Sequence, residues 1–112
     1  MSNLNPVMKN PFEYMAFIDA IALKIRQSNE TDPDVIHDSI YGLVKGSSVM
    51  NDFDQAWDMV GMIRDWNPSL LSHAMDRVLE HGTEGQDLNH QMRWHAYYII
   101  RIDLERKLED LL

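Results

Sequence analysis

The sequence has no cysteine and no long apolar run, and each absence excludes a class of protein. None of the 112 residues is cysteine, which excludes disulfides, thiolate zinc sites and cysteine nucleophiles and agrees with a reducing compartment. No stretch approaches the roughly 18 apolar residues of a membrane span. The first ten residues, MSNLNPVMKN, lack the apolar core of a signal peptide. We therefore expect a cytoplasmic protein that does not associate with a membrane.

Basic residues are also scarce. Ten Lys and Arg stand against 18 Asp and Glu, for a net charge of −8. Such a surface repels phosphate backbones, so direct nucleic-acid binding is not expected. Residues 28–65 hold eight acids and two bases, a local net charge of 2 − 8 = −6. Clustered negative charge steers a basic protein towards it. The predicted acidic partner-binding surface comprises Glu30, Asp32, Asp34, Asp38, Asp52, Asp54 and Asp58.

Helical signals recur along the whole chain. Three Asx-Pro pairs predict an N-cap followed by proline in the first turn of a helix. They are Asn10-Pro11, Asp32-Pro33 and Asn67-Pro68. Asn51 or Asp52 and then Asp87 supply two further capping candidates. No segment alternates convincingly like a strand. We therefore predict an all-α fold: one domain over residues 1–112, a compact bundle of about five helices, with residues 1–9 flexible.

Apolar residues at helical spacing predict the inner faces of the first four helices. The expected core positions are Tyr14, Ile18, Ile21 and Ile25, then Ile36, Ile40 and Leu43, then Phe53, Ala56, Trp57, Val60 and Ile63, and finally Leu71, Ala74, Met75 and Val78. Trp57 is thus expected in the core. Gly61, inside the same helix, is expected to permit close approach of a neighbouring element.

The last helix, predicted to run from Asp87 to Leu112, carries two apolar stripes. One contains Leu88, Met92, His95, Ile99 and Ile102; the other contains Tyr97, Ile100, Leu104, Leu108 and Leu111. A helix with two such stripes is either central in its own fold or covered on one side by a second molecule. The second stripe is accordingly a predicted apolar interface, through which a homodimer would form. Opposite charges four apart predict three local ion pairs: Arg101–Glu105, Asp103–Lys107 and Arg106–Asp110.

No catalytic or cofactor motif emerges from the sequence. His90 and His95 are five apart, so their side chains point about 140° away from each other on one helix. Two D-x-x-H motifs, Asp34–His37 and Asp87–His90, resemble in spacing the E-x-x-H of di-iron carboxylate bundles. A simpler interpretation assigns both aspartates to helix starts. A metal-binding bundle remains an alternative, while the main interpretation includes no metal, no cofactor and no catalytic residue.

The function expected from the sequence is that of a small, acidic, non-enzymatic protein-binding module. One form is an inhibitor or immunity-type protein, of phage or mobile-element kind, whose carboxylates stand in for phosphates in the groove of a basic, nucleic-acid-handling protein. A homodimeric helical adaptor or regulator is the second alternative, besides the metal-binding bundle.

Overall fold

The computed structural model describes residues 10–81 and 87–112, and within these ranges it contains six helices and no strand. The all-α bundle is confirmed. The predicted flexibility of residues 1–9 lies outside the described residues. The helices are α1 (Pro11–Gln27), α2 (Pro33–Lys45), α3 (Ser48–Asn51), α4 (Phe53–Trp66), α5 (Pro68–His81) and α6 (Leu88–Lys107). The four-residue α3 was not predicted, and no described helix is long and apolar enough to cross a membrane.

Five of the six helices begin at the capping residues that the sequence indicates. In each, a side-chain oxygen accepts a hydrogen bond from a backbone N–H in the first turn, at 2.8–3.3 Å. The capping residues are Asn10, Asp32, Asp52, Asn67 and Asp87. Such a bond satisfies an amide that has no partner inside the helix, which stabilises the helix by about 1 kcal/mol. The short α3 begins at Ser47 without a side-chain cap.

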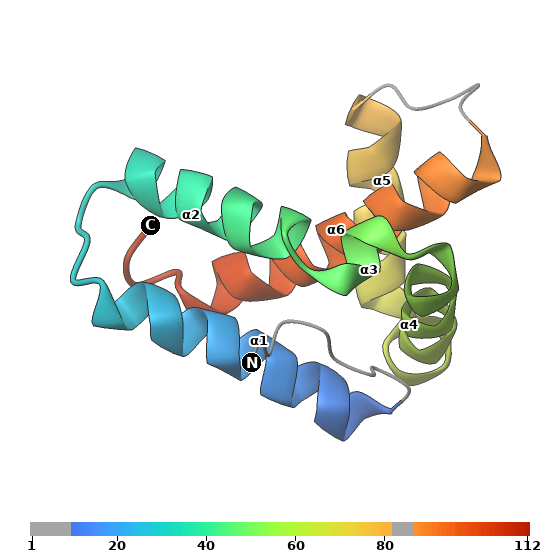
Figure 1. The fold of residues 1–112 in the computed structure, drawn as a ribbon, viewed down its shortest axis with the longest axis horizontal. Coiled ribbons are helices and arrows are strands. Elements are labelled where there is room, and N and C mark those ends of the chain that lie inside the picture. The colour runs from blue at the N-terminus through green and yellow to red at the C-terminus, as the bar shows by residue number, and fades with distance from the viewer. Residues whose placement is uncertain (1–9, 82–86) are drawn as a thin grey trace.

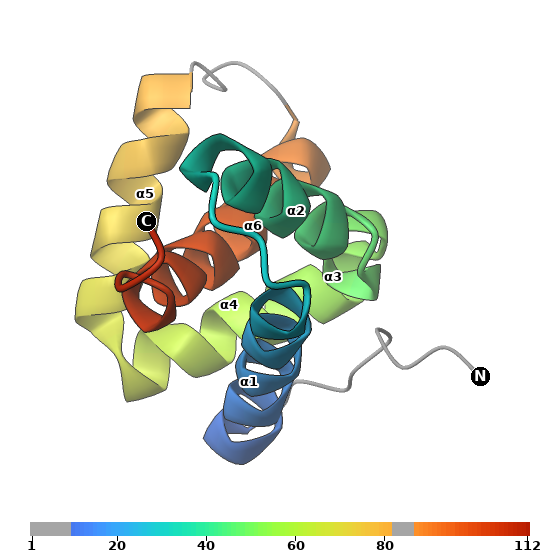
Figure 2. The ribbon, with the colours of Figure 1, turned by 90° about the vertical axis from the view of Figure 1, so that its left-hand side faces the viewer.

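Helix α6 is the centre of the bundle. It runs between α1 and α2 in Figure 1, and in Figure 2 it is surrounded by α2, α4 and α5. All five residues from Ala96 to Ile100 are buried, as are Ile102 and Leu104. Burial of consecutive residues means that the helix is covered on every side rather than along one stripe. Of the two arrangements open to a doubly apolar helix, the chain therefore adopts the central one.

The side chains predicted to form an apolar interface on α6 lie in the core of this chain. Tyr97, Ile100, Leu104 and Leu108 are at most 1% exposed, and Leu111 is packed against the same core. Side chains this deeply buried present nothing to a second molecule. The stripe through which a homodimer was expected is therefore covered by the other helices of the same chain.

Two inner faces differ from their predictions. On α4 the buried residues are Ala56, Met59 and Ile63, whereas Trp57 is 51% exposed. On α5, Leu70 is buried with Ala74 and Val78, and Met75 is exposed. In both helices the buried stripe is rotated from the one predicted. Trp57 on α4 and Met75 on α5, which were expected in the core, are exposed instead. The α1 and α2 predictions are confirmed at Tyr14, Ile18, Ile21, Ile25, Ile36 and Ile40, all of which are buried.

The C-terminal end of the chain is bound to α1. Helix α6 ends at Lys107 rather than Leu112, and Lys107 Nζ lies 2.7 Å from Asp19 Oδ1. Arg26 donates from both terminal nitrogens to the Asp110 carboxylate, at 2.7 and 3.1 Å. These tertiary pairs take the place of the predicted local partners of Lys107 and Asp110. The third predicted pair, Arg101–Glu105, is confirmed at 3.0 Å.

A partly buried hydrogen bond joins the same two helices nearer the core. The Tyr14 hydroxyl of α1 donates to the Asp103 carboxylate of α6. Burial, reinforced by that carboxylate, raises the pKa of Tyr14 far above its ordinary value. The hydroxyl therefore stays protonated and donates this hydrogen bond between α1 and α6.

Candidate functional site

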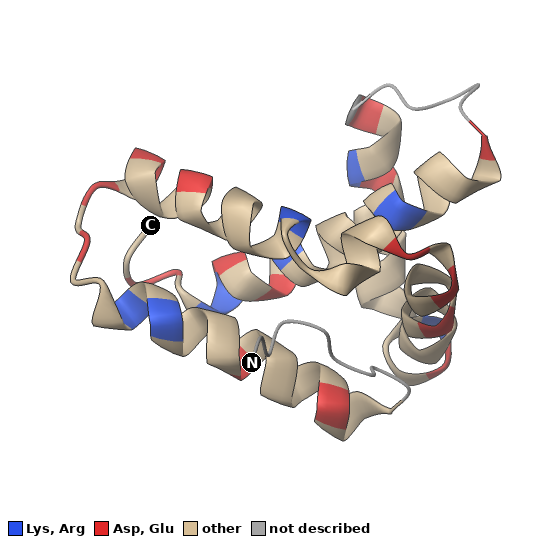
Figure 3. Cartoon of the chain, in the orientation of Figure 1, with Lys and Arg blue, Asp and Glu red and all other residues tan. Residues whose placement is uncertain are grey.

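The structure divides the predicted acidic surface into two groups. Glu30, Asp32, Asp34 and Asp38 lie in the α1–α2 connection and the first half of α2, whereas Asp52, Asp54 and Asp58 lie at the start of α4. Figure 3 shows acidic residues of these two regions at opposite ends of the long axis, which measures 38 Å. The seven carboxylates therefore do not form one surface that a single groove could cover.

Several of these carboxylates have local structural roles. Glu30 accepts backbone hydrogen bonds from Thr31 and Asp32 at 3.0 and 3.1 Å. Asp32 and Asp52 cap α2 and α4. Two pairs of exposed aspartates then remain, each four residues apart: Asp34 with Asp38 on α2, and Asp54 with Asp58 on α4. The two pairs have the same spacing and begin at the same position of their helices, the second residue. Only the side chains around each pair can therefore distinguish a binding site from an ordinary solvent-exposed surface.

The α4 pair has an exposed aromatic residue beside it. Stepping about 100° per residue places Asp54, Trp57, Asp58 and Gly61 within about 100° of one another, opposite the buried stripe of the helix. We call these four residues the α4 face. The Trp57 ring packs against Phe53, with centroids 5.7 Å apart and planes tilted by 41°. This contact supports the indole while leaving half of the residue exposed.

Gly61 leaves open space on the α4 face. A Cβ atom built at this position would meet nothing within 4 Å, so the neighbour that the sequence led us to expect is not part of the described chain. Gly61 is one helical turn after Trp57, and its missing side chain uncovers the backbone there. The face therefore combines a supported aromatic ring, two carboxylates and open space beside the helix backbone.

This combination suits a cationic side chain. A guanidinium stacks favourably on an indole face and forms strong hydrogen bonds to carboxylates. The two aspartates also repel each other mildly at this spacing, a cost that a bound cation would remove. The only described base within α4, Arg64, donates instead to the adjacent Asp65 at 3.2 Å.

The α2 pair has different surroundings. Its neighbouring aromatic residue, Tyr41, is already covered by a cation of the same helix: Lys45 Nζ lies 5.2 Å from the ring centroid and 3.1 Å from the hydroxyl. No described lysine or arginine is placed in the same way over Trp57. Of the two acidic groups, the α4 face is therefore the one with an available aromatic surface.

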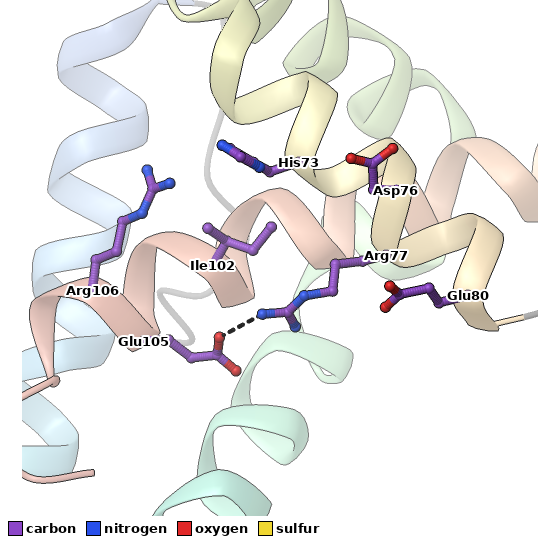
Figure 4. A pocket seen from close by; sticks show the side chains of 7 residues that line it. All are labelled: His73, Asp76, Arg77, Glu80, Ile102, Glu105 and Arg106. Atoms are coloured by element: carbon purple, nitrogen blue, oxygen red, sulfur yellow. Dashed lines mark hydrogen bonds and ion pairs between the residues drawn. The ribbon is translucent and has the colours of Figure 1, made fainter.

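A polar groove between α5 and α6 is the second candidate (Figure 4). It encloses about 290 Å³ and is lined by His73, Asp76, Arg77, Glu80, Ile102, Glu105 and Arg106. Arg77 Nη2 donates to Glu105 at 3.1 Å, and the other oxygen of Glu105 accepts from Arg101 Nε at 3.0 Å. Arg101 also donates to the Tyr97 hydroxyl at 3.1 Å. Burial raises the pKa of Tyr97, although the nearby Arg101 opposes the shift.

The groove is explained by helix packing. Glu105 bridges Arg77 of α5 and Arg101 of α6, so its charge is used to hold the two helices together. His73 and Asp76 are three residues apart on α5, a spacing at which an imidazole and a carboxylate can interact. None of the seven lining residues carries a hydroxyl or thiol that this pair could activate as a nucleophile. Sequence periodicity could not reveal the groove, since its walls come from two helices.

The two D-x-x-H motifs do not converge. Asp34 lies in the exposed first turn of α2 and Asp87 caps α6, and these helices start at opposite ends of the molecule (Figure 1). No group of three or more potential metal ligands occurs within residues 10–81 and 87–112. His90 packs its ring 6.1 Å from that of Trp94, and the His95 Nδ1 atom lies 2.7 Å from the Gln91 carbonyl oxygen. The described geometry therefore gives the metal-binding alternative no shared site.

Comparison with known proteins does not add a candidate. No protein-family model matches the chain, and searches of curated proteins and of solved structures give no match either. The functional assignment consequently depends on the geometry of the α4 face and of the groove.

Proposed function

We propose that the protein is a non-enzymatic protein-binding module and that its α4 face receives a basic side chain of the partner. The observation that carries the proposal is the position of Trp57: a half-exposed indole supported by Phe53, with Asp54 and Asp58 beside it and open space over Gly61. In this arrangement an arginine of the partner stacks on the indole and donates to the two carboxylates.

The electrostatics of the whole chain support this assignment. A net charge of −8 attracts a basic partner over distances of about 10 Å at ordinary salt, before any contact forms. The α4 face then supplies specificity through a ring whose orientation is already set by Phe53. Preorganisation of this kind lowers the entropic cost of ordering the site on binding.

Inhibition is one form of this function. A protein that handles nucleic acid has a basic groove, and a module with exposed carboxylates on a rigid helix competes with phosphates for that groove. Because the acidic residues are divided between two ends of the molecule, we assign the contact to α4 and not to all seven carboxylates. An inhibitor or immunity-type role is thus proposed with a footprint of about one helix.

A matched pair of double variants tests the proposal. Asp54→Asn with Asp58→Asn removes two charges from the α4 face; Asp34→Asn with Asp38→Asn removes two charges at the same spacing on α2. Binding of a hexa-arginine peptide is measured by titration calorimetry at several salt concentrations. We expect the α4 double variant to lose about tenfold in affinity and the α2 double variant less than about twofold.

Trp57→Leu separates stacking from charge. It keeps an apolar residue beside both carboxylates, and we expect it to weaken hexa-arginine binding about threefold to tenfold. Equal losses in the two double variants, together with unchanged binding by Trp57→Leu, would show only general attraction to an acidic protein and would refute the α4 face as a site.

A further inference from the structure

The outer side of α1 is apolar although nothing in the described chain covers it. Phe12 is 84% exposed and Leu23 is 56% exposed, and Ala16 and Ala20, also exposed, lie between them. At about 100° per residue these four side chains fall within about 80° of one another. We call them the α1 stripe. In both Figure 1 and Figure 2, α1 lies at an edge of the molecule.

Helix α1 is therefore apolar on two opposite sides. Its inner side carries buried Tyr14, Phe17, Ile18, Ile21 and Ile25, which face the core. A helix with two apolar sides is normally covered on both of them. One edge of the α1 stripe lies next to the C-terminal turn. The charged residues of α1 at that edge, Asp19 and Arg26, already form ion pairs with Lys107 and Asp110 of the same chain.

The α1 stripe is self-complementary when a second copy is laid against it antiparallel. Large residues stand at its ends and small residues at its centre, so Phe12 of one copy faces Leu23 of the other and Ala16 faces Ala20. The midpoints of these pairs are 17.5 and 18, which differ by half a residue, or about 0.75 Å along the helix. Because the two midpoints nearly coincide, a single two-fold axis passing near residue 18 of each copy produces both contacts, as a symmetric dimer requires.

The charges at the other edge follow the same symmetry. Glu13 and Lys24 are 11 residues apart and lie within about 20° of each other around the helix. The midpoint of this pair is 18.5, so the same axis brings Glu13 of each copy next to Lys24 of the other. Lys24 forms no ion pair in the described part of the chain. Two intermolecular ion pairs would flank the apolar contact.

We infer that the α1 stripe binds the α1 stripe of a second copy of this chain in an antiparallel, two-fold symmetric dimer. This interface is separate from the α4 face and does not depend on the proposed function. Because one helix from each copy makes the contact, the interface belongs to the small, weak class, with a dissociation constant on the order of micromolar.

Leu23→Lys tests the apolar contact, with Leu79→Lys as its control. Leu79, on α5, is 57% exposed, so both substitutions place the same charge at equally exposed leucines. Sedimentation equilibrium is measured from about 1 to about 500 μM. We expect the wild type and Leu79→Lys to pass from 13.1 kDa to twice that mass, while Leu23→Lys raises the dissociation constant at least about tenfold.

Charge reversal tests the register. Glu13→Lys and Lys24→Glu should each weaken the dimer, since like charges then face each other across the two-fold axis. The double reversal should restore it to within about twofold of the wild type, because opposite charges face each other again. Thermal unfolding of each variant checks that α1 remains folded.

Three results would overturn the inference. The first is a wild-type mass of one chain at every concentration, which would leave the stripe to a different occupant. The second is equal weakening by Leu23→Lys and Leu79→Lys. The third is a double reversal no stronger than the single variants although all of them remain folded, since the antiparallel register would then be incorrect.

Discussion

Leu104→Ala distinguishes a central α6 from an α6 that carries an interface. Leu104 is fully buried, and the substitution removes three carbon atoms from a packed core. Leu-to-Ala changes at such positions cost about 2–5 kcal/mol, through lost transfer free energy and the cavity left behind. With a denaturant slope of about 1–3 kcal/mol per molar urea, a loss of 3 kcal/mol lowers the unfolding midpoint by about 1–3 M.

Urea unfolding followed by circular dichroism measures this loss, and Leu23→Ala provides the control. Leu23 is a mostly exposed leucine, so below the dimer concentration range its truncation should change stability by no more than about 0.5 kcal/mol. If Leu104→Ala cost less than about 1 kcal/mol while changing the sedimentation mass, α6 would carry an interface after all. The central position of the helix would then be refuted.

Three further expectations concern α4 and the C-terminal turn. In thermal or urea unfolding, Met59→Ala should destabilise the chain by about 2–4 kcal/mol and Trp57→Ala by less than about 1 kcal/mol. A larger loss for Trp57→Ala would contradict the finding that Met59, and not Trp57, faces the core. Gly61→Ala should raise the free energy of unfolding by about 0.5–1 kcal/mol, because the added Cβ meets no atom within 4 Å and alanine has the higher helix propensity. The same substitution should weaken hexa-arginine binding. A loss of stability would indicate a neighbouring element close to Gly61. Hydrogen bonds from Arg26 lower the pKa of Asp110. The Arg26–Asp110 pair therefore stabilises the fold above the unfolded-state pKa of the carboxyl group, and this stabilisation is lost as the pH falls through the folded-state pKa. Asp110→Asn should reduce the loss of stability between about pH 5 and about pH 2, as measured by unfolding at each pH.

Helix starts could be predicted from the sequence because capping is local. Asn10, Asp32 and Asp87 each bond an amide only two or three residues away, so the signal and the structure share the same short segment. The inner faces of α4 and α5 depend instead on where neighbouring helices lie. Trp57 and Met59 are both apolar and separated by about 160° on the helix, so only the packed fold decides which one is buried.

Two of the three predicted charge pairs do not form in the described structure, and the candidate site could not be predicted, for the same reason. Spacing within α6 favours Asp103–Lys107, yet Asp103 accepts from Tyr14 and Lys107 binds Asp19, both on α1. A local pair of exposed charges contributes only a few tenths of a kcal/mol, so a tertiary partner displaces it easily. The acidic pairs were visible in the sequence, and each has an open glycine one turn further on, Gly42 on α2 and Gly61 on α4. The exposed indole that distinguishes the α4 pair became evident only from packing.

Burial of α6 on all sides also explains why the outward-facing apolar residues occur where they do. The central helix needs apolar side chains around its whole circumference, and Tyr97, Ile100 and Leu104 are used there. A peripheral helix needs only one apolar side, so exposed Phe12 and Trp57 on α1 and α4 exceed what the core requires. Single exposed apolar residues are ordinary, but grouped ones characterise contact surfaces. Phe12 belongs to a self-complementary stripe and Trp57 to an acidic face, and these different surroundings are why the two helices are assigned different partners.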